Sequence, residues 1–327
     1  MIVPHSLKQS LVARAALRRG LSDFFTQHRF LEIDTPVLVR RPGTEVHLGY
    51  FSSQWRDIQG IERKFWLRSS PELHMKIALG AGLERIYQFA PCFRNDGELG
   101  PIHRPEFTML EYYETAIDFE PFIARTEELI RAGLAELAAV VPSANHFQMP
   151  KVVPRFSVYE AFQEFAGVAL VDEDPDLAML CIQAGVQSVR PDDDFETAFF
   201  KTLMERVETG LAQWPAAILF DYPPSQAALS QIVDGRAKRF EIYANRVELC
   251  NGFLELLDPA ANRSRLDESD LRRKNLGKEV TDDEPEFHRA LALGIPKCCG
   301  NALGFDRLLM LALGAENLHS AQGWTFP

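Results

Sequence analysis

The sequence predicts an α+β domain in which a mainly antiparallel β-sheet is flanked by helices. Neighbouring strand-like segments are joined by short loops, as 84–94 is to 105–114, and not by the helical crossovers of a βαβ pattern. Segments with apolar residues at helical spacing lie between the groups of strands. No internal repeat or low-complexity linker interrupts the 327 residues, so we expect a single domain over 1–327.

The elements follow from local patterns along the chain. Residues 6–28 predict a helix, because Ser6 and Gln9 form a capping-box pair and apolar residues follow at helical spacing. Residues 30–38 alternate like a strand, and Pro36 places that strand at a sheet edge or an interface. Similar patterns predict strands at 64–70, 84–94, 105–114, 216–222, 239–244, 247–257 and 298–305, and helices at 71–82, 119–140, 158–166, 175–184, 194–211, 263–275, 283–293 and 306–314. The helices within 157–215 would form an insertion in the domain.

Composition excludes several classes of protein. A hydrophobic content of 46% and a charged content of 25% are ordinary for a globular protein. The net charge of −11 argues against stable nucleic-acid binding, where Lys and Arg supply most of the affinity. No apolar run approaches the roughly 20 residues that span a bilayer, and no signal peptide is evident. Five cysteines without a CxxC pair suit a reducing compartment, so we expect a cytoplasmic protein.

The strand PEFTMLEYYE carries the first candidate site. A period of two puts Phe107, Met109, Glu111 and Tyr113 on one face. An aromatic ring, a carboxylate and a phenol in a row would suit a ligand with a planar ring at one end and an ammonium at the other. The alternative is a strand whose first two residues are core and whose last two form a solvated edge, and from this strand alone that alternative is favoured.

The partner strand ends in CFRND, which supplies the second candidate. Arg94 lies at the strand end, beside a loop that carries Asp96, His103 and Arg104. A guanidinium fork there could hold a carboxylate or a phosphate in bidentate geometry. An ordinary surface ion pair between Arg94 and Asp96 or Glu98 is the simpler explanation of these residues alone.

The stretch RVELCNGFLEL raises a question of charge. Glu241 and Glu248 come from strand segments that can form a hairpin through 244–245, which would bring the two acids side by side. Two neighbouring carboxylates repel each other unless a cation bridges them, and Mg²⁺ bound to phosphate oxygens would do so. The alternative, solvent-facing acids and a cap residue, is disfavoured because so many apolar residues surround these acids.

The alternation of side chains between the two faces of a strand constrains this third candidate site further. Asn251, Phe253 and Glu255 share one strand face, whereas Glu248 has the opposite parity. If all four residues serve one pocket, a β-bulge at Gly252 or near Cys250 is needed to bring Glu248 onto the same face.

Taken in order, these stretches resemble the catalytic domain of class II aminoacyl-tRNA synthetases, and within them the lysine-specific branch. The helix and strand ending at Pro36 resemble the first motif of the family, which usually builds a homodimer interface. The stretch from CFRND to HRPEFTMLEYYE resembles the second motif, and GNALGFDRLLML (300–311) resembles the third. SSPELHMK (69–76) and RFEIYANRVELCNGFLEL (239–256) match the lysine branch. The resemblance covers nearly the whole chain and implies a class II synthetase catalytic fold that uses ATP and Mg²⁺.

The chain also departs from lysyl-tRNA synthetases. Their anticodon-binding domain precedes the first motif, and the helix beginning near residue 6 leaves no room for it here. SPELHMK, PPSQAALSQI (223–232) and ALGFDRLLMLALGAE (302–316) are similar to the elongation factor P lysine ligases. Those relatives use the same adenylate chemistry and deliver the amino acid to a lysine of elongation factor P. A minimal lysyl-tRNA synthetase, a related amide-forming ligase and a non-catalytic regulatory paralogue remain alternatives.

The resemblance implies roles for individual residues. Arg94 would contact the α-phosphate and the substrate carboxylate, and Arg307 would stack on the adenine and reach the γ-phosphate. The other nucleotide-site residues would be Asp96, His103 and Arg104 lining the nucleotide, Phe107 under the adenine, and Glu241 and Glu248 holding Mg²⁺. The substrate-site residues would be Asn251 at the carboxylate, Glu255 and Tyr113 at the ε-ammonium, and Glu72 and Glu111 at the other amino group, with Phe253 and Ala302 also in the substrate site.

Three positions differ from the pattern of the synthetases. Asp96 stands where glutamate is usual, and Arg104 replaces an asparagine, so the register of 95–104 is open. Ala302 replaces a glycine of the third motif, as it does in the elongation factor P ligases. The additional methyl group would reshape the pocket, which favours a substrate whose amino group is shifted, such as (R)-β-lysine rather than lysine.

Overall fold

The computed structural model describes residues 7–95 and 100–324. Contacts within the chain divide it into two compact units, residues 1–147 with 255–327 and residues 148–254. The expectation of a single catalytic domain over 1–327 stays a prediction.

The first unit is built on a sheet with the order β1, β5, β6, β12. Its strands are β1 (Leu31–Glu32), β5 (Arg85–Phe93), β6 (Glu106–Thr115) and β12 (Cys298–Gly304). The pairings β5–β6 and β6–β12 are antiparallel, and only the short β1 runs parallel to β5. Gln88, Glu111 and Ala302 lie directly opposite one another across the three strands. This register confirms that Phe107, Met109, Glu111 and Tyr113 share one face, since directly opposed residues point the same way.

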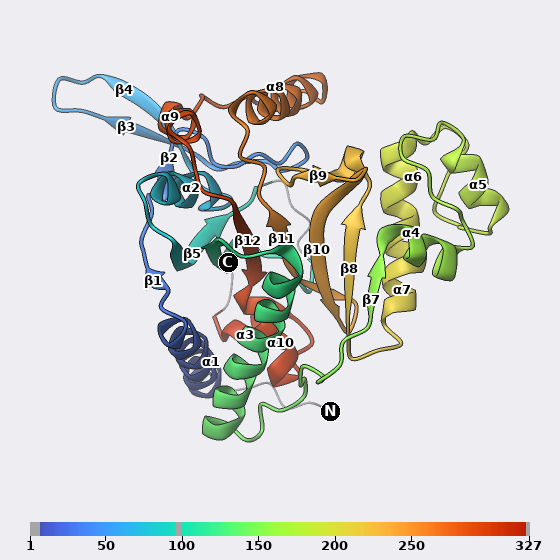
Figure 1. Ribbon diagram of the computed structural model, residues 1–327. Helices are drawn as coiled ribbons and strands as arrows, with labels where there is room; N and C mark the ends of the chain where they lie inside the picture. The colour runs from blue at the N-terminus through green and yellow to red at the C-terminus, as the bar shows by residue number, and fades with distance from the viewer. Residues whose placement is uncertain (1–6, 96–99, 325–327) are drawn as a thin grey trace. The chain divides into compact units, whose positions relative to one another are not determined.

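Helices surround this sheet (Figure 1). They are α1 (Leu7–Gln27), α2 (Glu72–Gly80), α3 (Phe119–Val140), α8 (Pro259–Asn275), α9 (Pro285–Leu293), α10 (Phe305–Leu313) and α11 (Leu318–Gln322). Helices α1 and α3 pack closely because glycines meet at their crossing. A Cβ on Gly20 would lie 2.6 Å from the Cβ of Glu136 and 3.1 Å from the Cα of Gly133. Alanine at Gly20 would therefore push the helices apart, and alanine at Gly133 would displace the side chains of Leu17 and Leu21.

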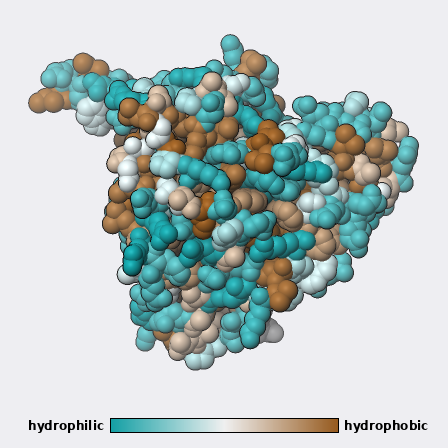
Figure 2. All heavy atoms as spheres, viewed as in Figure 1, coloured by the Kyte–Doolittle hydropathy of each residue, from teal (hydrophilic) through white to brown (hydrophobic). Residues whose placement is uncertain are grey.

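A smaller sheet in the same unit was only partly predicted. It has the order β2, β4, β3, with β2 (Leu38–Val39), β3 (Ser52–Arg56) and β4 (Glu62–Leu67). The hairpin β3–β4 projects at the upper left of Figure 1, and hydrophobic residues lie on it in Figure 2. The prediction of one strand over 30–38 is wrong: the chain pairs briefly as β1, breaks, and pairs again as β2 in the other sheet. Proline lacks the N–H that a continuous ladder needs, which explains the break around Pro36.

The second unit contains its own run of strands in the order β11, β10, β8, β7, with β9 beside β10. These strands are β7 (Arg155–Ser157), β8 (Ala216–Tyr222), β9 (Ile232–Val233), β10 (Arg236–Ala244) and β11 (Val247–Leu254). Its helices are α4 (Val158–Ala161), α5 (Leu177–Gln183), α6 (Phe195–Thr202) and α7 (Glu208–Leu211), with π-helical turns at Phe162–Ala166 and Leu203–Val207 and a 3₁₀ turn at Pro224–Gln226. Their apolar faces pack on β8 around the stacked rings of Phe162 and Phe199, 5.1 Å apart.

The hairpin β10–β11 carries the predicted irregularity. Glu241 lies opposite Asn251, and Tyr243 lies opposite Glu248. Between these pairs β11 has one additional residue, Leu249, so a β-bulge lies next to Cys250 as predicted. The bulge brings Glu248 onto the face of Glu241 and Asn251. The turn is one residue later than predicted, because Asn245 and Arg246 both have positive φ, at 48° and 66°.

All five cysteines are buried, and none of them forms a disulfide bond. Among the residues that the structure describes, no helix has the length and apolar character needed to cross a membrane.

Candidate active site

Glu111 lies at the centre of a buried acidic cluster in the first unit. Its side chain is enclosed in the middle of β6. Tyr113 Oη donates a hydrogen bond to Glu111 Oε1 over 2.7 Å, and Ser70 Oγ donates one to Oε2 over 2.9 Å. Burial, followed by the negative charge of Glu72, raises the pKa of Glu111 to about 8. A carboxyl in this setting is easily ionised only when a cation approaches it.

Lys76 is the internal cation of this cluster. Its ammonium has no exposed surface, and it lies 2.7 Å from Glu72 Oε1 and 2.6 Å from Glu255 Oε2. Burial by itself would lower the pKa of Lys76, but the two carboxylates outweigh it and raise that pKa. Glu255 is also buried, and burial raises its pKa to about 7 although Lys76 opposes the shift. The ion pairs therefore keep Lys76 charged inside the protein.

Local sequence explains how these groups meet. Glu72 and Lys76 are four residues apart on α2, which puts them on one helix face. Gly300 on β12 lies opposite Tyr113. A Cβ at Gly300 would overlap the ring of Tyr113 and the carboxylate of Glu255, so the glycine leaves the space that both side chains occupy.

Arg94 follows β5 and lies over the ring that was predicted to hold adenine. Its guanidinium carbon is 5.0 Å from the centroid of Phe107, and its Nη2 is 3.6 Å from Glu45 Oε1. Phe107 and Ala302 pack on a small apolar cluster of Ala90, Cys92 and Met109. A flat, apolar floor thus adjoins a cation, which suits a nucleotide base next to a phosphate.

Arg307 lies in the first turn of α10, directly after the glycine-patterned strand β12. Its Nη2 is 3.1 Å from His103 Nε2. The preceding residue, Asp306, accepts a 2.7 Å hydrogen bond from the backbone N–H of Thr108 and pairs with Arg14 of α1. Because Asp306 is bound on two sides, it fixes the start of α10 and hence the direction from which Arg307 extends.

Glu241 belongs to a polar network on the second unit. Arg239 pairs with Glu241 Oε1, and Tyr243 Oη donates a 2.6 Å hydrogen bond to Oε2. Arg239 Nε also donates to Asn251 Oδ1 over 3.1 Å, and the guanidinium lies 4.4 Å from the ring centroid of Tyr222. Burial would lower the pKa of Arg239, but Glu241, Tyr222 and Glu248 together outweigh it and raise that pKa.

Glu241 and Glu248 fit a magnesium ion in their chemistry. The bulge puts both carboxylates on one face, and Mg²⁺ prefers carboxylate oxygens supplemented by phosphates. Among the described residues no three or more His, Cys, Asp or Glu side chains are arranged so that they could hold a metal ion, so substrate oxygens would have to complete the coordination.

The structure brings together the residues predicted for the two amino groups, Glu72, Glu111, Tyr113 and Glu255. On the second unit, Glu241, Glu248, Asn251 and Phe253 share the face of β10 and β11. His103 is exposed and Arg104 is half-buried, and Asp96 lies outside the described residues. The roles of all these residues stay predictions.

Sequence reasoning missed the cations that hold the acids. These are Lys76, Arg239 and Arg14, and the hydroxyl donors Ser70 and Tyr243 were missed with them. The i, i+4 spacing of Glu72 and Lys76 was a usable signal. The pairing of Arg14 with Asp306 spans the whole chain and leaves no local pattern.

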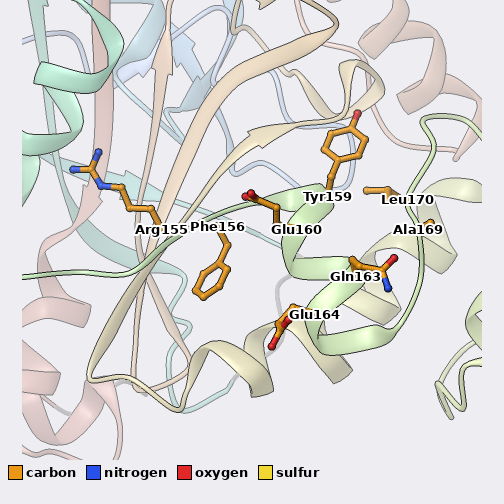
Figure 3. Close-up of a pocket in the computed structure, with 8 residues that line it drawn as sticks. All are labelled: Arg155, Phe156, Tyr159, Glu160, Gln163, Glu164, Ala169 and Leu170. Atoms are coloured by element: carbon orange, nitrogen blue, oxygen red, sulfur yellow. The ribbon is translucent and has the colours of Figure 1, made fainter.

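An open groove of about 640 Å³ also lies on the second unit, lined by residues of 155–170 (Figure 3). It contains none of the predicted site residues.

Comparison with known proteins agrees with the motifs. The family model "tRNA synthetases class II (D, K and N)" matches residues 1–327. A protein of Vibrio cholerae serotype O1 named elongation factor P–(R)-β-lysine ligase is 33% identical, over 99% of this chain and 98% of that protein. Proteins of the same name from Histophilus somni and Avibacterium paragallinarum are 36% and 34% identical, over 96% and 97% of this chain and 94% and 95% of their own. The chain therefore belongs to the class II tRNA synthetase family (D, K and N).

Proposed function

We propose that this protein is an ATP-dependent ligase that activates lysine or (R)-β-lysine as an aminoacyl-adenylate and joins it to a lysine side chain of elongation factor P. The names of the similar proteins support this reading, since they match over nearly their whole length. The family supports the use of ATP. We extend the proposal to Mg²⁺, a homodimer and a cytoplasmic location.

The acids of the pocket carry the proposal: Glu111 and Glu255 are buried, and Glu72 beside them is partly buried. A pocket with Glu72, Glu111 and Glu255 would be costly to fold unless cations meet it, and Lys76 supplies only one. A diamino acid brings two more ammonium groups. An uncharged analogue would leave carboxylates unpaired, so the pocket would select strongly against it.

The first chemical step is the attack of the substrate carboxylate on the α-phosphorus of ATP, with pyrophosphate leaving in line. Both reactants are anionic, so the protein must neutralise charge and align the atoms. We assign charge neutralisation to Arg94, which directly follows β5, and to Arg307, which lies on α10. Glu241 and Glu248 would hold Mg²⁺, which supplies further neutralisation of the phosphates when bound.

In the second step, a neutral amine of the acceptor lysine attacks the carbonyl of the adenylate. The new amide bond forms, AMP leaves with the electron pair of the broken anhydride bond, and the amine loses a proton. The acid pocket holds the amino groups of the adenylate throughout, which keeps the carbonyl in one place.

The test is an acceptor competition. The protein is incubated with ATP, Mg²⁺, lysine or (R)-β-lysine, total tRNA and elongation factor P, and the mass of each acceptor is measured. We expect elongation factor P to gain one aminoacyl group while tRNA stays uncharged. Arg94→Ala should abolish the gain, and Arg56→Ala, an exposed arginine paired with Glu62, should not. Charged tRNA with unmodified elongation factor P would support a lysyl-tRNA synthetase instead, and no adenylate formation would support a regulatory paralogue.

A further inference from the structure

Lys76 has a position that the chemistry of the proposed reaction does not require. It is a buried lysine side chain inside a pocket proposed to bind a lysine side chain. Its ammonium lies between Glu72 Oε1 and Glu255 Oε2, at 2.7 and 2.6 Å. It therefore occupies part of the negative charge that the substrate would otherwise meet.

The charges in the pocket can be counted. Glu72, Glu111 and Glu255 contribute three carboxylates, and Lys76 contributes one ammonium. The other groups facing the cluster are neutral or engaged elsewhere. Burial and neighbouring acids raise the pKa of Tyr113 and of Cys298, so both are uncharged. Arg68 gives its hydrogen bonds to Pro91 O, Thr35 and Pro36 O. Burial lowers the pKa of Arg68, the charge of Glu111 opposes this shift, and no ion pair joins Arg68 to the three carboxylates within the described residues.

When the ammonium groups of a bound substrate keep all three acids ionised, two negative charges thus remain for the substrate. A diamino monocarboxylic acid has two ammonium groups, and we propose that Lys76 is a positioning residue that neutralises one of three pocket carboxylates so that the remaining charge matches two substrate ammonium groups. This inference rests on the proposed function. It explains why an internal lysine is retained in the pocket: with three uncompensated carboxylates, one would take up a proton and lose its hold on an amino group.

The position of Lys76 also fixes where the charges lie. Glu255 follows β11 and Glu72 begins α2, so the two acids come from distant parts of the chain. Without a cation between them, two carboxylates this close would repel each other and turn apart. Lys76 therefore sets the geometry of both acids as well as their number.

The test replaces Lys76 with methionine, which is unbranched and one atom shorter and which removes the charge. Lysine- and (R)-β-lysine-dependent pyrophosphate exchange is measured from pH 6 to 9, with KM for the amino acid and for ATP determined separately. We expect Lys76→Met to raise KM for the diamino acid at least tenfold at pH 7, to leave KM for ATP within twofold, and to move the pH midpoint of the amino-acid KM upward by about one unit. Lys76→Arg, which keeps the charge, should leave that midpoint in place.

Controls separate this inference from the proposed function. Lys64→Met removes an exposed lysine that pairs with Glu279 and should change neither KM nor midpoint. If Lys76→Met does not fold in a thermal melt, Lys76→Gln, which keeps a hydrogen-bond donor, replaces it. A folded neutral variant with unchanged amino-acid KM and unchanged midpoint would overturn the inference. Wild-type protein without any exchange driven by a diamino acid would overturn the proposed function instead.

Discussion

Glu111 offers a test in which stability and activity change in opposite directions. The proposed perturbation is Glu111→Gln, which keeps the shape of the side chain; its amide oxygen can still accept from Tyr113, and its amide nitrogen would donate to Ser70 Oγ. In the wild type, burial and Glu72 raise the pKa of this carboxyl from 4.5 to about 8. An acid whose pKa is raised by folding stabilises the folded state least at high pH, because the unfolded chain ionises freely and the folded chain does not.

The magnitude follows from the pKa difference. A shift of 3.5 units, from 4.5 to 8, corresponds to about 5 kcal/mol once the pH exceeds the folded pKa. At pH 6 only the interval from 4.5 to 6 counts, which is about 2 kcal/mol. We therefore expect Glu111→Gln to be more stable than the wild type without substrate, with a gain that grows by about 2 to 3 kcal/mol between pH 6 and pH 9. At the same time kcat/KM for the diamino acid should fall roughly 10- to 200-fold, the value of a lost charged hydrogen bond.

The assay is urea denaturation of both proteins at pH 6, 7.5 and 9, together with pyrophosphate exchange. Glu114→Gln is the matched control, because Glu114 is buried on the same strand and pairs with Arg85 and Arg125 at 3.1 and 3.3 Å. Breaking those pairs should destabilise the protein at every pH. If Glu111→Gln destabilises the protein as Glu114→Gln does, Glu111 is an ordinary structural acid and the reasoning about the pocket is refuted.

Three further predictions concern the proposed reaction. The KM for lysine, measured by steady-state pyrophosphate exchange, should fall as pH rises from 6.5 to 8.5, by up to about tenfold per pH unit while Glu111 ionises. A KM that does not change with pH would contradict the raised pKa of Glu111. Glu241→Gln should lower kcat by at least about 100-fold and raise the Mg²⁺ concentration for half-maximal rate, and an unchanged Mg²⁺ curve would exclude Glu241 as a ligand. Ala302→Gly should lower the preference for (R)-β-lysine over lysine by about 10-fold, as measured by parallel exchange assays with the two amino acids. If the wild type uses both amino acids equally well, this prediction has no basis.

The sheet at the candidate site could be predicted from sequence because strand parity is a local property. The shared face of Phe107 and Glu111 followed from a period of two, and the pairing of β6 with β5 and β12 confirms it. The bulge beside Cys250 was predicted because Glu248 and Asn251, three residues apart, would point to opposite faces of a regular strand. In both cases neighbouring residues along the chain contain the information.

Long-range partners could not be predicted in the same way. Lys76 meets Glu255, and Arg14 meets Asp306, across most of the sequence, and nothing local marks either pair. The strand β3 was missed because all its residues are exposed, so it lacks the alternation of apolar and polar residues by which strands are identified. Residues 30–38 do alternate between apolar and polar, but only Leu31–Glu32 and Leu38–Val39, near the two ends of this stretch, pair with other strands.

The ion pairs of the acids indicate which acid contributes most to selection of the substrate. Glu255 pairs with Lys76, Glu241 with Arg239, and Asp306 with Arg14, so each of these charges is compensated within the protein. Glu111 differs, because its hydrogen bonds come from the hydroxyl groups of Tyr113 and Ser70, and within the described part of the chain it forms no ion pair. A substrate ammonium near Glu111 would therefore replace a proton, whereas one near Glu255, Glu241 or Asp306 would have to compete with an ion pair. For this reason, selection for a diamino acid should depend more on Glu111 than on the better-paired acids around it.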